Sequence, residues 1–402
     1  MALSIAQKDM VAEGTSLHIV VTTLRCNQKC VYCQASSVNP NLKEYDMSLD
    51  TAKKTVDFIF QTPSNNITIE FQGGEPTMNF EVIKYINEYA KELNKSYNKW
   101  IEFLLVTNLN NMDEGKMNYL IDAGINICTS FDGHKSLHDK NRPKINKESS
   151  FDSAIYWVRK FNNEYEKRNI ASKVYGLITI TKESLEHPKK IIDEYVGAGF
   201  NEINIREMTS LGCATKQWKN IGYSPEEFIE FWENSMDYIF ELNKKGVNIK
   251  ERMICIMLRK MKGLEENFMD LRSPCGAVIG QMVYNHDGNI FSCDEGRMIG
   301  SDKFKVGSVY EDNYIDVVSS DKSQAIVLAS LNDNIEPCNS CDYQAYCGIC
   351  PVCNYAEQGE MVCDIKNTPR CKIFKSMFKY IDERYNDPVD NRILNNWVIN
   401  HG

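Results

Sequence analysis

Cysteine is the residue type in this sequence that could do the most chemistry, with 15 copies in 402 residues. Thiolates bind soft metals and act as nucleophiles, whereas disulfides form mainly in secreted proteins. The first residues of the chain lack the basic and apolar segments of a secretion signal, so the cysteine count favours metal binding or catalysis. Three cysteines stand alone, Cys128, Cys213 and Cys255, and we expect them to be small buried hydrophobic residues.

Three cysteines are packed into one short segment with the spacing Cys26-x3-Cys30-x2-Cys33. Three thiolates leave one coordination position of a tetrahedral zinc without a ligand, and His18 is the one candidate upstream of the loop. A [4Fe–4S] cluster held by three cysteines keeps one iron open for a reactant. The spacing therefore favours an iron–sulfur cluster with an open site, and a zinc site that borrows a distant ligand is the alternative.

Nine further cysteines follow residue 270. They are Cys275, Cys293, Cys338, Cys341, Cys347, Cys350, Cys353, Cys363 and Cys371. Two CxxC pairs among them would fit a zinc ribbon, but a ribbon uses four cysteines and leaves five unexplained. Two four-cysteine iron–sulfur clusters would use eight of the nine.

Strand-like and helix-like segments alternate around the first cysteine group. The expected strands cover residues 17–23, 66–71, 100–108, 125–132, 173–180 and 201–206. The expected helices cover residues 48–61, 80–93, 113–124, 151–168 and 188–199, with N-caps at Asp46 or Ser48 and at Asp113. This alternation predicts an α/β fold of parallel strands with right-handed crossovers. Six such units suit a partial barrel, and a doubly wound open sheet is the competitor.

The composition changes after the alternating region. We expect three units: a barrel over residues 1–222, a helical connection over 223–270, and a cysteine-rich domain over 271–402. The last unit has short segments, a hairpin at 285–293 and a final helix at 371–386. A region this poor in aliphatic residues needs metal clusters to hold it together.

Charge and hydropathy argue against two classes of partner. The formal net charge is −9 and no basic block occurs, which argues against nucleic-acid binding. No segment approaches the run of about 18 apolar residues that a membrane helix needs. We expect a cytoplasmic protein that binds neither nucleic acid nor membrane.

The segment CNQKCVYC, residues 26–33, resembles the CxxxCxxC signature of radical S-adenosylmethionine (SAM) enzymes. FQGGEPTMNF, VTNLN, TSFDG and HDKNRP resemble further landmarks of that family, in the same order and at strand ends. The resemblance implies a partial (β/α)6 radical SAM barrel, a [4Fe–4S] cluster with an open site, and bound SAM. It implies SAM contacts from Gln72, Gly73, Gly74, Glu75, Asn108, Ser130, Asp132 and Arg142. The glycines would let the backbone approach SAM closely, and the planar Arg142 guanidinium would pair with its carboxylate.

The second cysteine array resembles a SPASM domain, which carries auxiliary [4Fe–4S] clusters in a subgroup of these enzymes. The match rests on C-x12-G-x4-C from Cys275 to Cys293 and on C-x2-C-x5-C from Cys338 to Cys347. It implies two auxiliary clusters. The first would use Cys275, Cys293 and one of Cys350 and Cys353, and the second would use Cys338, Cys341, Cys347 and either Cys363 or Cys371. The spacing of two residues before Cys350, where the pattern has three, leaves these choices open.

The resemblance also implies an activity, because radical SAM enzymes reductively cleave SAM to a 5′-deoxyadenosyl radical that abstracts a substrate hydrogen. The wording of the motifs is most similar to maturases of ribosomally made peptides of the His-Xaa-Ser and cyclophane-forming type, which modify or cross-link side chains oxidatively. Asp294, next to Cys293, is the candidate base, and Glu295 and Arg297 are expected to face the substrate.

Two alternatives to this function stay open. An anaerobic sulfatase maturase that forms formylglycine would also use a carboxylate beside an auxiliary-cluster cysteine. A non-enzymatic zinc-binding adaptor would not explain the motifs at the strand ends. The expected partners are a peptide or protein substrate, a low-potential electron donor such as ferredoxin or flavodoxin, and a separate leader-binding protein.

Overall fold

The computed structural model of the protein describes residues 12–264 and 268–399. Within these ranges the central feature is a ten-stranded sheet in the order β10-β9-β8-β1-β2-β3-β4-β5-β6-β7. Its first six strands in sequence are β1 (Leu17–Thr23), β2 (Asn66–Gly73), β3 (Trp100–Thr107), β4 (Ile125–Ser130), β5 (Tyr175–Thr179) and β6 (Glu202–Arg206). Each of them pairs in parallel with the next. The predicted α/β barrel fold is confirmed.

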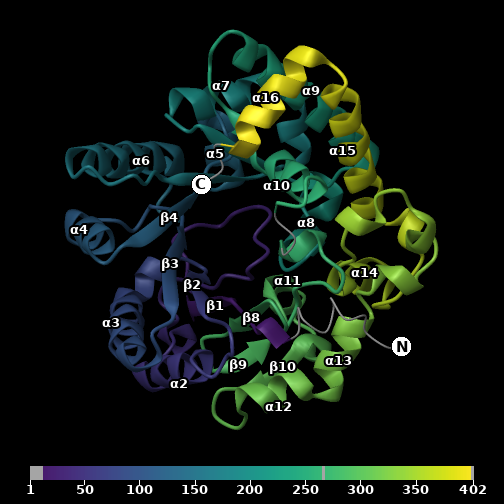
Figure 1. Ribbon diagram of the computed structural model, residues 1–402. Helices are drawn as coiled ribbons and strands as arrows, with labels where there is room; N and C mark the ends of the chain where they lie inside the picture. The colour runs from purple at the N-terminus through teal and green to yellow at the C-terminus, as the bar shows by residue number, and fades with distance from the viewer. Residues whose placement is uncertain (1–11, 265–267, 400–402) are drawn as a thin grey trace.

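Amphipathic helices connect the parallel strands and cover their outer side. They are α2 (Leu49–Ile59), α3 (Phe80–Tyr97), α4 (Glu114–Asp122), α5 (Lys135–Asn141), α6 (Ser150–Lys167) and α7 (Pro188–Gly197). Figure 1 shows α2, α3, α4 and α6 outside the strands, which surround a central space. As predicted, Ser48 caps α2 by accepting from the Thr51 backbone N–H, and Asp113 caps α4. The left-handed Gly124 and Gly199 follow the ends of α4 and α7, with φ of 70° and 90°.

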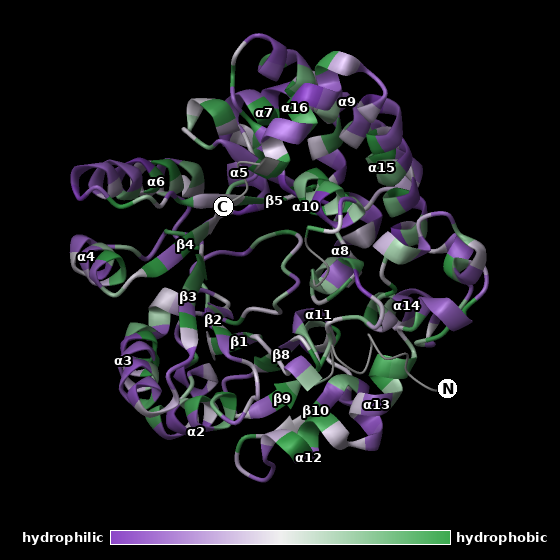
Figure 2. Cartoon of the chain, in the orientation of Figure 1, coloured by the Kyte–Doolittle hydropathy of each residue, from purple (hydrophilic) through white to green (hydrophobic). Residues whose placement is uncertain are grey.

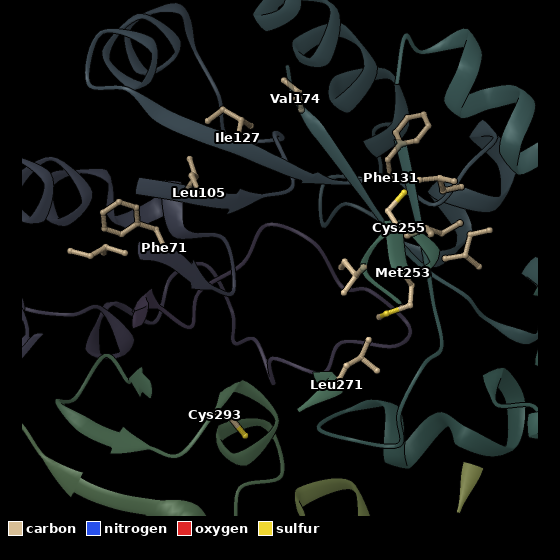
Figure 3. Packing of buried hydrophobic residues seen from close by; sticks show 14 of the residues in the cluster. Phe71, Leu105, Ile127, Phe131, Val174, Met253, Cys255, Leu271 and Cys293 are labelled. Carbon is tan, nitrogen blue, oxygen red and sulfur yellow. The ribbon is translucent and has the colours of Figure 1, made fainter. Parts of the chain in front are cut away.

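The two faces of the strands differ in chemistry. Phe71, Leu105 and Ile127 are register partners on β2, β3 and β4, and none of them is exposed to solvent. Figure 3 shows these three side chains on neighbouring strands. The residues just before them, Glu70, Leu104 and Asn126, line an interior cavity instead. This period of two places apolar residues under the helices, whereas the inward positions include polar side chains such as Glu70 and Asn126.

The C-terminal half of the chain extends the same sheet. β8 (Gln281–Tyr284) pairs in parallel with β1, and β9 (Asn289–Phe291) and β10 (Lys305–Ser308) continue antiparallel beyond it. The turn between β8 and β9 lies within the hairpin expected at 285–293. The sheet crosses the predicted boundary at residue 270, so the cysteine-rich end is joined to the barrel by backbone hydrogen bonds.

The region after β6 is helical as predicted, and it also contains the short strand β7, which the sequence pattern missed. The region after β6 forms α8 (Ala214–Ile221), α9 (Pro225–Lys244), the short strand β7 (Lys250–Glu251) and α10 (Arg252–Met261). The cysteine-rich region forms α11 (Asp294–Met298), α12 (Tyr314–Ser319), α13 (Asp321–Leu328) and α14 (Pro351–Gln358). The end of the chain forms α15 (Pro369–Tyr385) and α16 (Pro388–Ile399).

Figure 2 shows mixed apolar and polar surfaces on α9, α15 and α16, which pack together. The predicted last helix thus continues into a second one. Among the described residues, no helix combines the length and apolar character needed to cross a membrane.

Candidate active site and cysteine clusters

The loop after β1 places Cys26, Cys30 and Cys33 on the wall of one cavity. The Cys33 backbone N–H donates to the Cys30 carbonyl at 3.2 Å, which turns the loop back on itself. Burial raises the pKa of the Cys26 thiol, and the neighbouring Cys30 adds to the rise. Burial also raises the pKa of Cys30 to about 11, against the opposing charge of Arg142. Because metals bind the thiolate form, cluster assembly here must release protons.

Gly73 and Gly74 bring the end of β2 against the backbone of the cysteine loop. A Cβ atom on Gly74 would lie 2.4 Å from the carbonyl oxygens of Leu24 and Arg25, and Gly73 has φ of 143°. The Gly74 N–H donates to the Thr23 carbonyl at 2.9 Å. These glycines are therefore required by packing against residues 23–25, in addition to any approach to SAM.

Glu75 fastens this junction to the next strand. Its carboxylate is fully buried and accepts from the Thr77 N–H, from the Thr107 hydroxyl at 2.7 Å and from the Asn108 N–H at 2.8 Å. The Asn108 side chain in turn donates to the Cys26 sulfur at 3.7 Å. The Glu75 carboxylate thus couples the ends of β2 and β3 to the cysteine loop.

A buried polar triad stands on the opposite side of the loop. The Tyr32 hydroxyl donates to Asp132 Oδ2 at 2.6 Å, and the Arg142 guanidinium donates to the same hydroxyl. Arg142 Nη1 lies 3.8 Å from Asp132 Oδ1. Arg142 Nε and Asp132 Oδ1 are buried without a hydrogen-bond partner in the described residues. The guanidinium therefore has donor capacity left for an anionic group in the cavity.

The cavity has a volume of about 670 Å³ and runs through the barrel from the cysteine loop to α11. Six of the eight predicted SAM-contacting residues line it, namely Gln72, Gly73, Gly74, Asn108, Ser130 and Arg142. Glu75 and Asp132 lie outside its wall and hold other site residues in place through the contacts just described.

Glu70 and Arg206 are among the charged residues of the cavity wall that were not singled out from the sequence. Burial raises the pKa of Glu70 to about 7, and the Gln72 amide donates to its carboxylate. Arg206 reaches Glu295 Oε1 at 3.0 Å, and burial raises the pKa of the Glu295 carboxyl against the opposing charge of Arg206. Both were detectable in principle, because Glu70 and Arg206 occupy inward positions in the period-two pattern of β2 and β6.

Asp294, the predicted base, lines the cavity at the start of α11. Its Oδ1 accepts from Arg297 Nε at 3.3 Å and Nη2 at 3.1 Å. Arg297 also donates to the Ala35 carbonyl, which docks α11 onto the segment after the cysteine loop. Glu295 lines the cavity as expected, whereas Arg297 is 8% exposed and serves mainly to hold Asp294.

Four buried C-terminal cysteines form a first set: Cys275, Cys293, Cys350 and Cys353, exposed by 9%, 3%, 9% and 6%. The Cys353 N–H donates to the Cys350 sulfur at 3.4 Å at the start of α14. Burial raises the pKa of the Cys275 thiol to about 12, and Cys350 adds to the rise. Burial also raises the pKa of Cys293, with Glu295 and Cys350 adding to it. The sequence analysis left open which of Cys350 and Cys353 belongs with Cys275 and Cys293, and both side chains are buried.

A second set consists of half-buried cysteines: Cys338, Cys341, Cys347 and Cys371. Burial raises the pKa of Cys338 to about 11, and Cys371 and Cys341 add to the rise. Burial likewise raises the pKa of Cys347 to about 12. At Cys363 burial is again the first cause of a raised pKa, but the next causes are carboxylates and no cysteine. The electrostatic neighbours of the two thiols therefore favour Cys371 over Cys363, although both side chains pack against one apolar cluster with Cys338.

The three lone cysteines and His18 lie outside the cysteine sets described above. Cys255 is fully buried and Cys128 is 7% exposed, as expected. Cys213 is only half-buried, and its N–H donates to the Cys33 carbonyl at 2.9 Å, so its expected place in a core is wrong. His18 is fully buried and its ring nitrogens contact the Tyr284 hydroxyl and the Thr15 carbonyl, so it is committed elsewhere than at the cysteine loop.

The donor groups fit iron–sulfur clusters better than single metal ions. Within residues 12–264 and 268–399, no three His, Cys, Asp or Glu side chains are arranged to hold one metal ion. Zinc with Zn–S bonds of about 2.3 Å would need its sulfur atoms close together, whereas a four-iron cluster holds its thiolates farther apart. The loop itself supplies three thiolates, and Arg142, whose buried Nε has no hydrogen-bond partner in the described residues, lines the same cavity. These residues fit an open cluster with an anionic ligand beside it.

Residues 20–195 match the family model of the radical SAM superfamily. This range begins in β1, ends in α7, and contains the three cysteines of the loop and all eight predicted SAM contacts.

Relatives also match over nearly the whole chain. A cysteine-type anaerobic sulfatase-maturating enzyme of Clostridium perfringens (strain ATCC 13124) is 24% identical over 399 residues, which cover 94% of this chain and 98% of that protein. The enzyme of the same description from Clostridium novyi (strain NT) is 22% identical over 376 residues, covering 91% and 95%.

Two kinds of solved structure share the fold. Native anSMEcpe with bound AdoMet and Cp18Cys peptide has a TM-score of 0.78 at 20% identity, covering 95% of this chain and 99% of that chain. Streptococcus suis SuiB bound to the precursor peptide SuiA has a TM-score of 0.62 at 17% identity, covering 87% and 74%.

Proposed function

We propose that this protein, which is a radical SAM enzyme with SAM and a [4Fe–4S] cluster as cofactors, oxidatively modifies a side chain of a peptide or protein. The predicted enzyme class and cofactors are confirmed by the family match. The observation that carries the substrate proposal is that one cavity joins the cysteine loop to Asp294 and Glu295. A bound substrate segment would thus meet the cofactor at one end and carboxylates at the other.

The six cavity-lining residues are proposed as the SAM contacts, with Arg142 holding the SAM carboxylate. Asp132 and Tyr32 would hold the guanidinium in place, and Glu75 would hold the loop and Asn108. When bound, the cluster and SAM supply the radical chemistry that removes a hydrogen atom from the substrate. The chain itself positions these groups and limits the access of water.

The two C-terminal cysteine sets are proposed as the ligands of the auxiliary clusters. The first cluster would take Cys275, Cys293, Cys350 and Cys353, and its four protein ligands would leave no iron open to substrate. The second would take Cys338, Cys341, Cys347 and Cys371, and Cys363 would stay a free thiol. The supporting observations are the burial of the first set and the mutual effects of the thiols within each set.

Asp294 is proposed as the group that accepts a proton from the substrate side chain as it is oxidised. It lines the cavity, and Arg297 fixes its orientation. Glu70 lies in the same cavity wall, and its raised pKa of about 7 makes it a second site able to exchange a proton at neutral pH.

The finer substrate class has two candidates. The motif wording favours oxidative cross-linking or modification of a ribosomally made peptide, as in the His-Xaa-Ser and cyclophane-forming systems. The end-to-end similarity to sulfatase-maturating enzymes favours formylglycine formation on a sulfatase. A low-potential ferredoxin or flavodoxin is the proposed reductant in either case, and a leader-binding protein would accompany the first.

The test is anaerobic reconstitution followed by SAM cleavage with dithionite and two kinds of peptide. One is a synthetic peptide with the cysteine-type sulfatase motif, and the other is the product of any short precursor gene beside this gene. Loss of two hydrogens from the precursor supports peptide cross-linking. Loss of two hydrogens together with exchange of the cysteine sulfur for a water-derived oxygen, which gives an aldehyde, supports sulfatase maturation. Asp294→Asn should keep SAM cleavage and lose the product. Absence of 5′-deoxyadenosine from fully loaded protein would overturn the proposal.

A further inference from the structure

Arg370 lies at the junction of the two C-terminal cysteine sets. It precedes Cys371 of the second set at the start of α15, and its side chain is 16% exposed. Its Nη2 donates to the Asp270 carbonyl at 2.8 Å and lies 3.7 Å from the Asp270 carboxylate. The guanidinium also covers the ring of Phe374, 4.4 Å from its centroid. These contacts hold the guanidinium in a fixed position between Asp270 and the Phe374 ring.

The guanidinium lies near the chain segment that connects the two cysteine sets. Gly348 stands between Cys347 of the second set and Cys350 of the first. A Cβ atom on Gly348 would lie 2.6 Å from the Asp270 carbonyl oxygen, the same atom that accepts from Arg370. The guanidinium and the Cys347–Cys350 segment thus meet at one carbonyl group, so the charge of Arg370 lies close to thiols of both sets.

The electrostatics of the thiols agree with this geometry. Burial raises the pKa of Cys347 to about 12, and Arg370 opposes that rise. At Cys350 the hydrogen bond from Cys353 is the main reason that the pKa is lowered, and Arg370 lowers it as well. One cation therefore favours the thiolate form in both sets.

The hydrogen bonding of Arg370 leaves it with unused donor capacity. Its Nε is buried and has no partner in the described residues, although such orphaned donors are costly. A sulfide or thiolate of a cluster is an anionic acceptor that would satisfy it. Hydrogen bonds and nearby charge are the protein's main means of setting the potential of iron–sulfur clusters.

We propose that Arg370 is a shared electrostatic partner of both auxiliary clusters, positioned between them so that each becomes easier to reduce. This rests on the proposed assignment of the two cysteine sets as cluster ligands. Arg370 is a positioning residue that acts through the clusters, because a fixed positive charge stabilises the added electron on either one. Each cluster takes up one electron and later passes it on. Arg370 itself is neither oxidised nor reduced, and no bond is formed or broken at it.

The test uses the Cys26→Ala/Cys30→Ala/Cys33→Ala background, in which only the auxiliary clusters remain. Midpoint potentials are read by EPR during dithionite titration for Arg370→Gln and Arg370→Lys. Gln keeps a donor for the Asp270 carbonyl and removes the charge, so both cluster signals should shift to more negative potential. Lys keeps the charge, so the shift should be much smaller.

Lys372→Gln is the matched control. It removes one positive charge from the same turn of α15, but the Lys372 side chain is 40% exposed and pairs with Glu226, so water screens it. It should leave both potentials unchanged. Equal potentials in Arg370→Gln and the background, with both clusters present, would overturn the proposal. Loss of iron from both Arg370 variants would also overturn it, by showing a role in assembly.

Iron content tests the cysteine ligands, and the midpoint potentials test the role of Arg370. If the background protein itself lacks the iron of two clusters, the ligand assignment fails. If the iron is present and the potentials do not respond to Arg370→Gln, only the role of Arg370 fails.

Discussion

The N-terminal cysteines lie within one loop of eight residues that lines the cavity, whereas the C-terminal cysteines come from segments spread between residues 275 and 371. The loop offers three thiolates, and each C-terminal set offers four. The first C-terminal set is also buried among core residues. A reactive cluster needs an open coordination position and a path for its partner, whereas a cluster that only exchanges electrons can be closed off. The number of cysteines separates the two proposed roles, whereas burial distinguishes only the first C-terminal set.

The largest expected effect on activity comes from removing the three cysteines of the N-terminal loop. Cys26→Ala/Cys30→Ala/Cys33→Ala should reduce SAM cleavage by about 100-fold or more and lower iron from about 12 to about 8 per chain, because one four-iron cluster is lost. Iron analysis and a 5′-deoxyadenosine assay measure both quantities. Cys213→Ala is the control, since Cys213 adjoins Cys33 outside the motif. An equal loss in that control would contradict the special role of the motif.

The second prediction sharpens the contrast within the C-terminal half. Cys353→Ser should open the first auxiliary cluster, so that added cyanide or imidazole changes its EPR signal. The same ligands should leave the wild-type auxiliary signals unchanged, because all four positions are filled by cysteine. Cys363→Ser is the matched control and should behave as wild type. A ligand-induced change in the auxiliary signals themselves, measured in the Cys26→Ala/Cys30→Ala/Cys33→Ala background that lacks the open cluster, would show that Cys353 is not a ligand.

The third prediction concerns the packing that holds the loop. Gly74→Ala places a methyl group against the carbonyls of Leu24 and Arg25, and should lower both SAM cleavage, by about 10-fold, and stability, by about 1–3 kcal/mol. Gly199→Ala is the control, because its Cβ would meet no atom within 4 Å. It should cost only about 1 kcal/mol from its positive φ and leave SAM cleavage intact. Thermal unfolding and the cleavage assay distinguish the two.

The smallest expected effect is on stability and concerns Glu70, which lines the cavity between the cysteine loop and α11. The folded protein holds a proton on Glu70 up to a pKa of about 7, against 4.5 for an ordinary glutamate. The wild type therefore loses stability as pH rises from about 4.5 to about 7, and Glu70→Gln does not. Glu70→Gln should exceed the wild type by about 1–2 kcal/mol at pH 8 and equal it at pH 4.5. Denaturant unfolding at both pH values checks this, and an equal difference at both would contradict it.

Much of the barrel could be predicted because its signals are local. Strand β1 has the predicted bounds, and Ser48 and Asp113 cap their helices as expected. The period of two in β2 also indicates which side chains face inward. By contrast, β7 is only two residues long and α16 follows directly after α15, and neither carries a distinct local pattern.

Contacts between segments that are distant in the sequence could not be predicted from the sequence pattern. The pairing of β8 with β1 joins residues more than 260 positions apart. The hydrogen bonds of Glu75 depend on donors at the end of β3. The proximity of Cys293 to Cys350 depends on the packing of α11 against α14, which these two cysteines cap. The spacing of the nine cysteines allowed several groupings, since sequence separation does not fix distance in space.

The sequence by itself determined the local chemistry of this protein: the three-cysteine loop, the order of the strand-end motifs and the alternation that builds a parallel sheet. These are set by neighbouring residues, because short-range hydrogen bonding and side-chain periodicity need no distant partner. The tertiary structure alone decided which C-terminal cysteines are buried, that Arg370 contacts Asp270, and which motif residues line the cavity. Those outcomes depend on long-range packing, in which every segment fixes the position of the others.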